Sequence, residues 1–189
     1  MQRFYVLSRC WLWVLCILYS APVYSSDQER ELLIQLIQGA KSYDDILPVI
    51  DIIERKPGFI TKIPLISPVD MKKARVTSPY GYRKDPMNGN IKFHSGVDLA
   101  LPLATTVHVT ADGEVSFSGR KAGYGNVIIV KHKWGFESKY AHLSVRYVGK
   151  GAIVKRGDVI GFVGNTGKST GNHLHYEIIK NKKQIKPCF

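Results

Sequence analysis

The sequence has 189 residues, of which 27 are Lys or Arg and 15 are Asp or Glu, so its formal net charge is +12. This length suits one domain with a hydrophobic core and a short appendage, and it excludes two full domains. Charged residues at 22% and aromatic residues at 11% exclude a disordered chain, and three cysteines exclude a disulfide scaffold.

The first 25 residues have the pattern of a secretory signal peptide. Arg3 and Arg9 are their only charges, an apolar run covers residues 11–19, and small residues follow up to Ser25. We predict cleavage after Ser25 and export to the periplasm or the medium. The alternative is an N-terminal membrane anchor, although this run is shorter than the ~20 apolar residues that cross a bilayer. Cys188 is then the only cysteine left, and we predict no role for it.

Charge is unevenly distributed over the rest of the chain. Residues 26–60 contain seven acidic and four basic residues, whereas residues 61–189 contain eight acidic and 21 basic residues. A basic body outside the cell favours an anionic partner such as a cell-wall polymer or a membrane surface. The bases are scattered rather than gathered with aromatic residues on one face, so we predict no nucleic-acid binding.

Residues 26–60 are predicted to be helical. Apolar residues recur at helical spacing from Asp27 to Lys41, and Asp27 can cap this helix. A second short helix is expected over 43–55, started or interrupted by Pro48. Four prolines between positions 57 and 79 predict an extended connector over 61–77.

From residue 78 the pattern changes to short β segments, which predicts a mainly antiparallel β-sheet domain over 78–189. Asp112-Gly113 predicts a hairpin between strands at 106–110 and 114–118. Further strands are expected at 126–132, 137–143, 153–154, 159–163 and 173–179. Residues 161–169 superficially resemble a phosphate loop, but Phe162 stands where its first glycine is needed.

Two histidine motifs carry the chemistry. His94 and Asp98 stand four residues apart, and His173 and His175 stand two apart on a predicted strand, which points both imidazoles to one face. Two histidines and one carboxylate suit Zn²⁺, and three protein ligands leave the fourth position of a catalytic site open. No HExxH helix supplies a glutamate base, so the remaining histidines are the candidates for proton transfer.

Several ordered motifs resemble the lysostaphin-type (LytM-like) zinc endopeptidases, which cleave peptidoglycan peptides. They are Ser78-Pro-Tyr-Gly-Tyr-Arg83, Phe93-His94-Ser-Gly-Val-Asp98, Tyr140-Ala-His142-Leu143, Gly164-Asn-Thr-Gly167 and Gly171-Asn-His173-Leu-His175-Tyr-Glu177. The resemblance implies that His94, Asp98 and His175 bind one zinc ion per chain. It also implies that His142 and His173 are unligated catalytic histidines, one of which takes a proton from water while the other donates to the oxyanion. It does not assign the two roles.

Four other polar residues lie outside this set of ligands and catalytic histidines. His108 and His132 are predicted to be structural or surface residues. Tyr82 and Arg83 precede the metal motif, where a phenol could support the oxyanion and a guanidinium could hold a peptide carboxylate. Packing explains Tyr82 and Arg83 equally well.

The sequence thus predicts an exported zinc metalloendopeptidase that hydrolyses peptide bonds in peptidoglycan stem peptides or cross-bridges. The alternative is a non-catalytic wall-binding regulator that activates a partner hydrolase. For residues 26–60 we hypothesise contact with the basic domain that restrains the site, with Asp44 or Asp45 turned towards the metal. The simpler interpretation is a spacer from a membrane or a partner.

Overall fold

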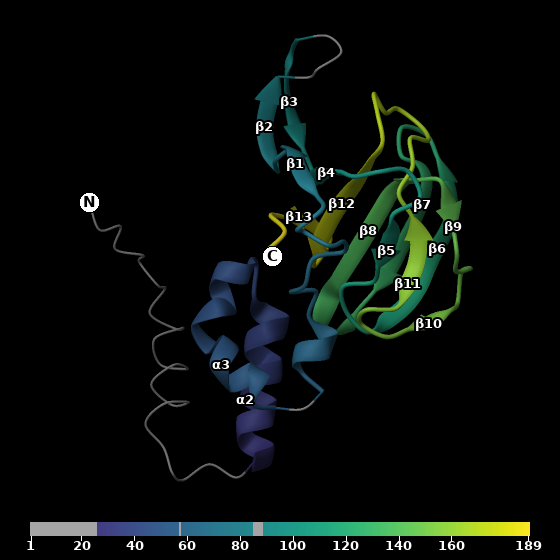
Figure 1. The fold of residues 1–189 in the computed structure, drawn as a ribbon. Coiled ribbons are helices and arrows are strands. Elements are labelled where there is room, and N and C mark those ends of the chain that lie inside the picture. The colour runs from purple at the N-terminus through teal and green to yellow at the C-terminus, as the bar shows by residue number, and fades with distance from the viewer. Residues whose placement is uncertain (1–25, 57, 85–88) are drawn as a thin grey trace.

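The computed structural model describes residues 26–56, 58–84 and 89–189. The predicted signal peptide or anchor lies outside them. Within the described residues, no helix is both long enough and apolar enough to cross a membrane. The described part consists of an N-terminal group of short helices and a β domain (Figure 1).

The predicted helical region begins with α2 (Ser26–Gly39), close to the expected bounds. The second predicted helix is broken into two single turns, η1 (Tyr43–Asp45) and η2 (Leu47–Val49), and the short helix α3 (Ile50–Glu54). Pro48 lies within η2, as expected for a residue that cannot donate to a helix. A last turn, η3 (Ile60–Lys62), precedes the β domain.

The main sheet is antiparallel throughout and has the order β1-β4-β12-β8-β7-β6-β10, with β13 paired to β12. Its strands are β1 (Arg75–Ser78), β4 (Val97–Ala100), β6 (Gly113–Lys121), β7 (Gly125–Lys131), β8 (Phe136–Leu143), β10 (Ile153–Val154), β12 (His173–Lys180) and β13 (Lys183–Ile185). The single turn η4 (Lys133–Gly135) joins β7 to β8. The predicted mainly β, antiparallel domain is therefore confirmed.

Two smaller sheets complete the domain. One consists of β5 (Thr106–His108), β11 (Val159–Phe162) and β9 (Val145–Arg146). The other is a two-stranded hairpin of β2 (Gly81–Lys84) and β3 (Ile91–His94), which stands above the main sheet at one end (Figure 1). Alternate residues of the strands fill a core that includes the fully buried rings of Tyr140 and Tyr176.

The hairpin predicted around Asp112-Gly113 is wrong. β5 pairs with β11, and β6 pairs with β7 and β10 instead. The glycine is needed for close packing, because a Cβ at Gly113 would lie 2.3 Å from the carbonyl oxygen of Lys131. The Asp112 carboxylate accepts the backbone N–H of Arg156, so it anchors the loop before β11 rather than a tight two-residue turn.

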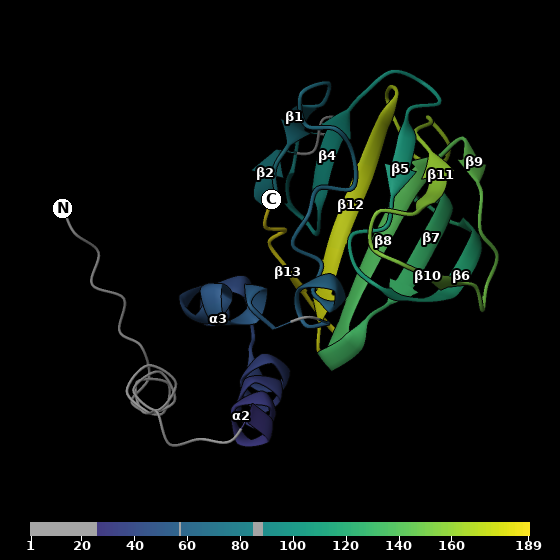
Figure 2. The same cartoon turned by 60° about the horizontal axis from the view of Figure 1, so that its bottom comes forward.

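The helical group packs against the β domain through aromatic rings. Tyr43 stacks on Phe136 with ring centroids 5.9 Å apart, and Phe59 stacks on Trp134 at 5.1 Å. Lys180, at the end of β12, donates to the carbonyl oxygen of Gln38 at 3.1 Å. The expected contact between residues 26–60 and the β domain is thus present, at the end of β12 away from the β2–β3 hairpin (Figures 1 and 2).

The position of residues 26–60 contradicts the hypothesis that Asp44 or Asp45 turns towards the metal. The Asp45 carboxylate accepts the backbone N–H groups of Lys41 and Ser42 and so caps its own turn. Asp44 is exposed, and no residue of 26–60 lines the cleft described below. Of the acids in this segment, Asp45 thus serves a local turn and Glu29 pairs with Lys56, a residue outside the cleft.

Candidate metal centre and cleft

Three elements bring the two histidine motifs together. β12 lies between β4 and β8, and its register places His175 opposite Asp98 of β4 on one side and Ala141 on the other. His94 ends β3, and the turn through Gly96 leads from it directly into β4, which carries Asp98. A Cβ at Gly96 would lie 2.4 Å from the carbonyl oxygen of Tyr176, so the glycine permits this close approach.

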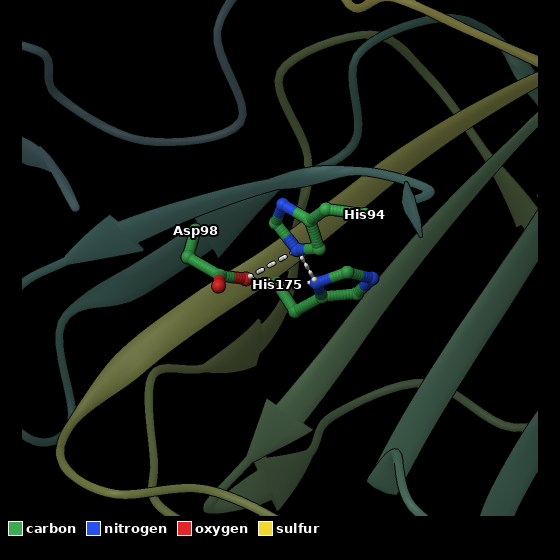
Figure 3. Close-up of side chains that lie close together, drawn as sticks. All are labelled: His94, Asp98 and His175. Atoms are coloured by element: carbon green, nitrogen blue, oxygen red, sulfur yellow. Dashed lines mark hydrogen bonds and ion pairs between the residues drawn. The ribbon is translucent and has the colours of Figure 1, made fainter. Parts of the chain in front are cut away.

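The predicted ligands His94, Asp98 and His175 converge at one point (Figure 3). His94 Nε2 lies 3.1 Å from His175 Nδ1 and 3.2 Å from Asp98 Oδ1. His175 Nδ1 lies 2.8 Å from the same carboxylate oxygen. Ligands of a tetrahedral zinc ion, bound at about 2.0–2.1 Å, stand ~3.3 Å from one another, so this cluster has nearly the spacing that zinc requires.

The outer nitrogen of each imidazole fixes its tautomer. His94 Nδ1 donates to the carbonyl oxygen of Pro79 at 2.8 Å, and His175 Nε2 donates to the carboxylate of Glu177 at 3.0 Å. In a neutral ring the nitrogen that faces Asp98 Oδ1 is therefore unprotonated, whereas a ring that has gained a proton donates to that oxygen. Three lone pairs that face one another repel unless a cation lies among them, and this donor set fits Zn²⁺.

The charges around the cluster favour the same outcome. Burial would raise the pKa of Asp98, but hydrogen bonds with His175 and His94 hold it well below its usual value. Burial would lower the pKa of His175, yet its contacts with Asp98 and Glu177 raise it above the usual value. The site thus holds an ionised carboxylate and attracts a positive charge, whether a proton or a metal ion.

Glu177 holds the His175 ring of the cluster in place through Nε2. The sequence did not assign this residue a role. Its carboxylate is fully buried and accepts from Ser95 Oγ at 2.8 Å, Tyr124 OH at 2.9 Å and Lys139 Nζ at 2.6 Å, besides His175. Burial would raise the pKa of Glu177, but the hydrogen bonds from His175 and Lys139 lower it to about 2. The period of two along β12 was the available signal, because it places Glu177 on the same face as His175.

The two predicted catalytic histidines, His142 and His173, lie side by side next to the cluster, with ring centroids 4.6 Å apart. His142 Nδ1 donates to the carbonyl oxygen of Thr166 at 2.7 Å, and His173 Nδ1 donates to that of Gly171 at 2.9 Å. Each ring therefore keeps Nε2 for the cleft. Burial lowers the pKa of His142 to about 4, so its ring is neutral at pH 7 in the metal-free protein.

These groups lie in an open cleft of about 360 Å³. Its walls come from the β2–β3 hairpin, the turn before β7 and the segment before β12. The lining residues are Arg83, Lys92, Phe93, His94, Ser95, Asp98, Gly123, Tyr124, His142, Lys168, Ser169, Thr170, His173 and His175.

Of the other polar candidates from the sequence, one lines the cleft and three do not. His108 and His132 lie outside the cleft, where they bond to the carbonyl oxygens of Gly157 and Asp112. Arg83 lines the cleft, whereas Tyr82 is 80% exposed on the other face of the hairpin. Tyr82 packs edge-on against Phe93, with ring centroids 5.1 Å apart, so packing within the hairpin accounts for Tyr82 but not for Arg83.

Comparison with known proteins decides the family. Residues 92–187 match the model of peptidase family M23. The chain belongs to this family. The resemblance to lysostaphin-type enzymes is thereby confirmed, and the described cluster lies within the matched M23 region.

Relatives of this M23 domain include Mpg, a DD-carboxypeptidase/endopeptidase of Neisseria meningitidis, which is 43% identical over 136 residues. Those residues are 72% of this chain but 30% of Mpg, so the chain spans less than a third of that relative. A zinc-containing peptidase from Vibrio cholerae has 35% identity and a TM-score of 0.60, over 64% of this chain and 37% of the other. The catalytic domain of lysostaphin from Staphylococcus simulans has 32% identity and a TM-score of 0.55, over 60% of this chain and 89% of that domain.

Proposed function

We propose that the chain is a zinc metalloendopeptidase of the cell envelope that hydrolyses peptide bonds in peptidoglycan. The observation that carries this proposal is the convergence of the ligand atoms of His94, Asp98 and His175 beside a histidine pair, in an open cleft of an M23 domain. Relatives named as DD-endopeptidases support the substrate class. The predicted export is consistent with a substrate outside the cytoplasm.

In this proposal His94, Asp98 and His175 hold one zinc ion. When bound there, zinc would polarise the scissile carbonyl and lower the pKa of a water molecule towards 7. Asp98 supplies the negative charge of the ligand set, and Glu177 fixes the ring of His175 through Nε2. The ligand atoms are thus held in place before the substrate arrives.

His142 and His173 handle the protons. Each donates Nδ1–H to a backbone carbonyl, which orients Nε2 towards the cleft. One ring accepts the proton of the attacking water at Nε2, and the other, protonated at Nε2, donates to the developing oxyanion. Neither ring forms a bond to the substrate, so no covalent intermediate with the enzyme is expected.

The basic β domain provides general attraction to the wall. Residues 61–189 have 21 basic and eight acidic residues, and peptidoglycan and its associated polymers carry carboxylates and other anions. Such long-range attraction raises the association rate and weakens with salt. We therefore expect binding to purified sacculi to fall as ionic strength rises.

Digestion of purified sacculi tests the proposed reaction. New free amino groups should appear without new reducing sugars, and a chelator should stop their release until zinc is restored. His142→Ala should remove the activity, while His108→Ala, outside the cleft, serves as the matched control. Reducing ends without amines would refute the peptidase assignment. Binding to sacculi without turnover, unchanged by His175→Ala, would instead identify a non-catalytic regulator.

A further inference from the structure

The β2–β3 hairpin presents two different faces. Its register pairs Tyr82 with Phe93 on one face and Arg83 with Lys92 on the other. Arg83 and Lys92 line the cleft next to His94, together with the ring of Phe93. Two like charges directly opposite each other on one face of a strand pair are destabilising. The hairpin therefore holds two cations together at the cleft wall at a cost in stability, which a bound anion would relieve.

The Arg83 guanidinium is incompletely satisfied. Its Nε is buried and has no hydrogen-bond partner among the described residues. One terminal nitrogen makes a long contact of 3.4 Å with the carbonyl oxygen of Lys84, and the other lies 3.7 Å from Asp98 Oδ2. A buried donor without a partner costs free energy, so native structures rarely leave one without a reason. The terminal nitrogens, on a side chain that is 29% exposed, thus have donors available for a ligand in the cleft.

The rest of the cleft wall has the same sign of charge. Lys168, from the segment before β12, adds a third cation, and among the described lining residues Asp98 is the only carboxylate. Neither Lys92 nor Lys168 forms an ion pair with a described residue. Asp98 belongs to the metal cluster and makes only the 3.7 Å contact with Arg83, so no described carboxylate of the wall pairs with Lys92 or Lys168.

We propose that Arg83 and Lys92 form a subsite for a free carboxylate of the substrate peptide, with Lys168 contributing from the facing segment. The planar guanidinium suits a carboxylate because it can donate two parallel hydrogen bonds. Stem peptides joined through diaminopimelate carry such carboxylates beside the cross-link, whereas a glycine bridge carries none. The inference rests on the proposed function and selects the stem-peptide cross-link as the substrate class.

A pair of matched substrates tests this subsite. One is a purified dimer of stem tetrapeptides cross-linked through diaminopimelate, and the other is the same dimer with its carboxylates converted to carboxamides. The zinc-loaded protein should show a KM about tenfold higher for the amidated dimer, with a similar kcat, as expected for the loss of a charge-assisted contact. A pentaglycine-bridged substrate should be cleaved no better than the amidated dimer. Equal KM values for the two dimers would overturn the inference.

Variants of the two hairpin cations separate recognition from structure. Arg83→Gln should raise the KM for the carboxylate dimer about tenfold and leave the KM for the amidated dimer unchanged. Lys92→Gln should have the same pattern with a smaller effect, and since Lys92 is exposed this variant should keep the fold. Arg120→Gln, at an exposed position of β6 outside the cleft, is the matched control and should behave as the parent.

An Arg83 that only positions Asp98 would give a different result. Arg83→Gln would then lower kcat equally for both dimers and leave the preference for carboxylates intact, which contradicts the subsite.

A binding measurement tests the subsite without turnover. The metal-free protein should bind a free stem tetrapeptide about tenfold more tightly than its amide, and Arg83→Gln should abolish the difference. Failure of the parent to cleave either dimer would refute the proposed function, while this binding difference would still test the subsite.

Discussion

The two ends of β12 solve the burial of charge in opposite ways. At the cleft end, Glu177 is fully buried but is surrounded by donors, two of which come from the cationic or cation-forming side chains of Lys139 and His175. At the helical end, Lys180 is 2% exposed, and its Nζ has the carbonyl oxygens of Gln38 and Trp134 as partners. One end is arranged around charges, and the other around neutral dipoles.

The pKa values show what this difference means. Hydrogen bonds outweigh the burial of Glu177, so its pKa falls to about 2 and the carboxylate stays ionised. Burial lowers the pKa of Lys180 to about 8 because no counter-charge offsets it. The cleft end therefore keeps fixed charges that can orient a metal ligand, whereas Lys180 at the helical end joins the helical group to the β domain.

The largest effect should follow from breaking the metal cluster. His175→Ala removes one ligand and leaves Asp98 and His94 unable to hold zinc alone. We expect loss of bound zinc, measured by metal analysis, and at least a 1,000-fold loss of activity on sacculi. His108→Ala should keep both. A His175→Ala protein with bound zinc and normal turnover would show that the metal lies elsewhere.

A smaller effect should follow from changing the support of that ligand. Glu177→Gln keeps the shape of the side chain but removes the negative charge that holds His175 Nε2–H. Because the loss of such outer partners commonly weakens metal binding, we expect zinc affinity to fall about 10–100-fold, as measured by competition with a chelator. Glu114→Gln, at an exposed position of β6, should leave the affinity unchanged.

His132 extends the comparison, because like Lys180 it rests on uncharged partners. Its ring bonds to the Asp112 carbonyl and to Ser138 Oγ, and burial lowers its pKa from 6.5 to about 4. Between pH 6.5 and about 4, His132 is protonated in the unfolded chain but neutral in the folded protein. The free energy of unfolding therefore falls as the pH drops, by up to about 1.4 kcal/mol per pH unit. Urea unfolding should show this dependence, and His132→Gln should lack this part of it. An identical pH dependence in the variant would contradict the account.

The smallest effect is expected at the helical end. Lys180→Met leaves the carbonyls of Gln38 and Trp134 without this donor but also removes a buried charge, so the two terms partly cancel. We expect a loss of about 1 kcal/mol in the free energy of unfolding and no change in kcat. Lys183→Met, exposed on β13, is the control. A clear fall in kcat for Lys180→Met would show that the helical group communicates with the cleft.

The sequence predicted the parts of the site that depend on local periodicity. Alternation along a strand placed His173 and His175 on one face, and the resemblance to lysostaphin-type enzymes joined His175 to His94 and Asp98 as one ligand set. The sequence could not predict the partners of Glu177. Lys139 lies on β8 and Tyr124 in the turn before β7, and only the order of strands in the sheet brings them to Glu177. Long-range pairing of this kind leaves no local pattern.

The same limit explains the two wrong predictions. Asp112-Gly113 has the composition of a tight hairpin, yet β5 found its partner in β11, some 50 residues further along the chain. Asp44 and Asp45 were expected to turn towards the metal, although Asp45 caps its own turn and Asp44 is exposed. Residue types that serve both turns and sites cannot be assigned until the tertiary contacts are known.

The central claim is that a cation lies among His94 Nε2, Asp98 Oδ1 and His175 Nδ1. Anomalous diffraction at the zinc absorption edge, from crystals of the zinc-loaded protein, tests it most directly. The account predicts one strong peak within bonding distance of these three atoms, with His142 and His173 unligated beside it. A peak held by other side chains, or ligation through the opposite nitrogens of the two imidazoles, would contradict it.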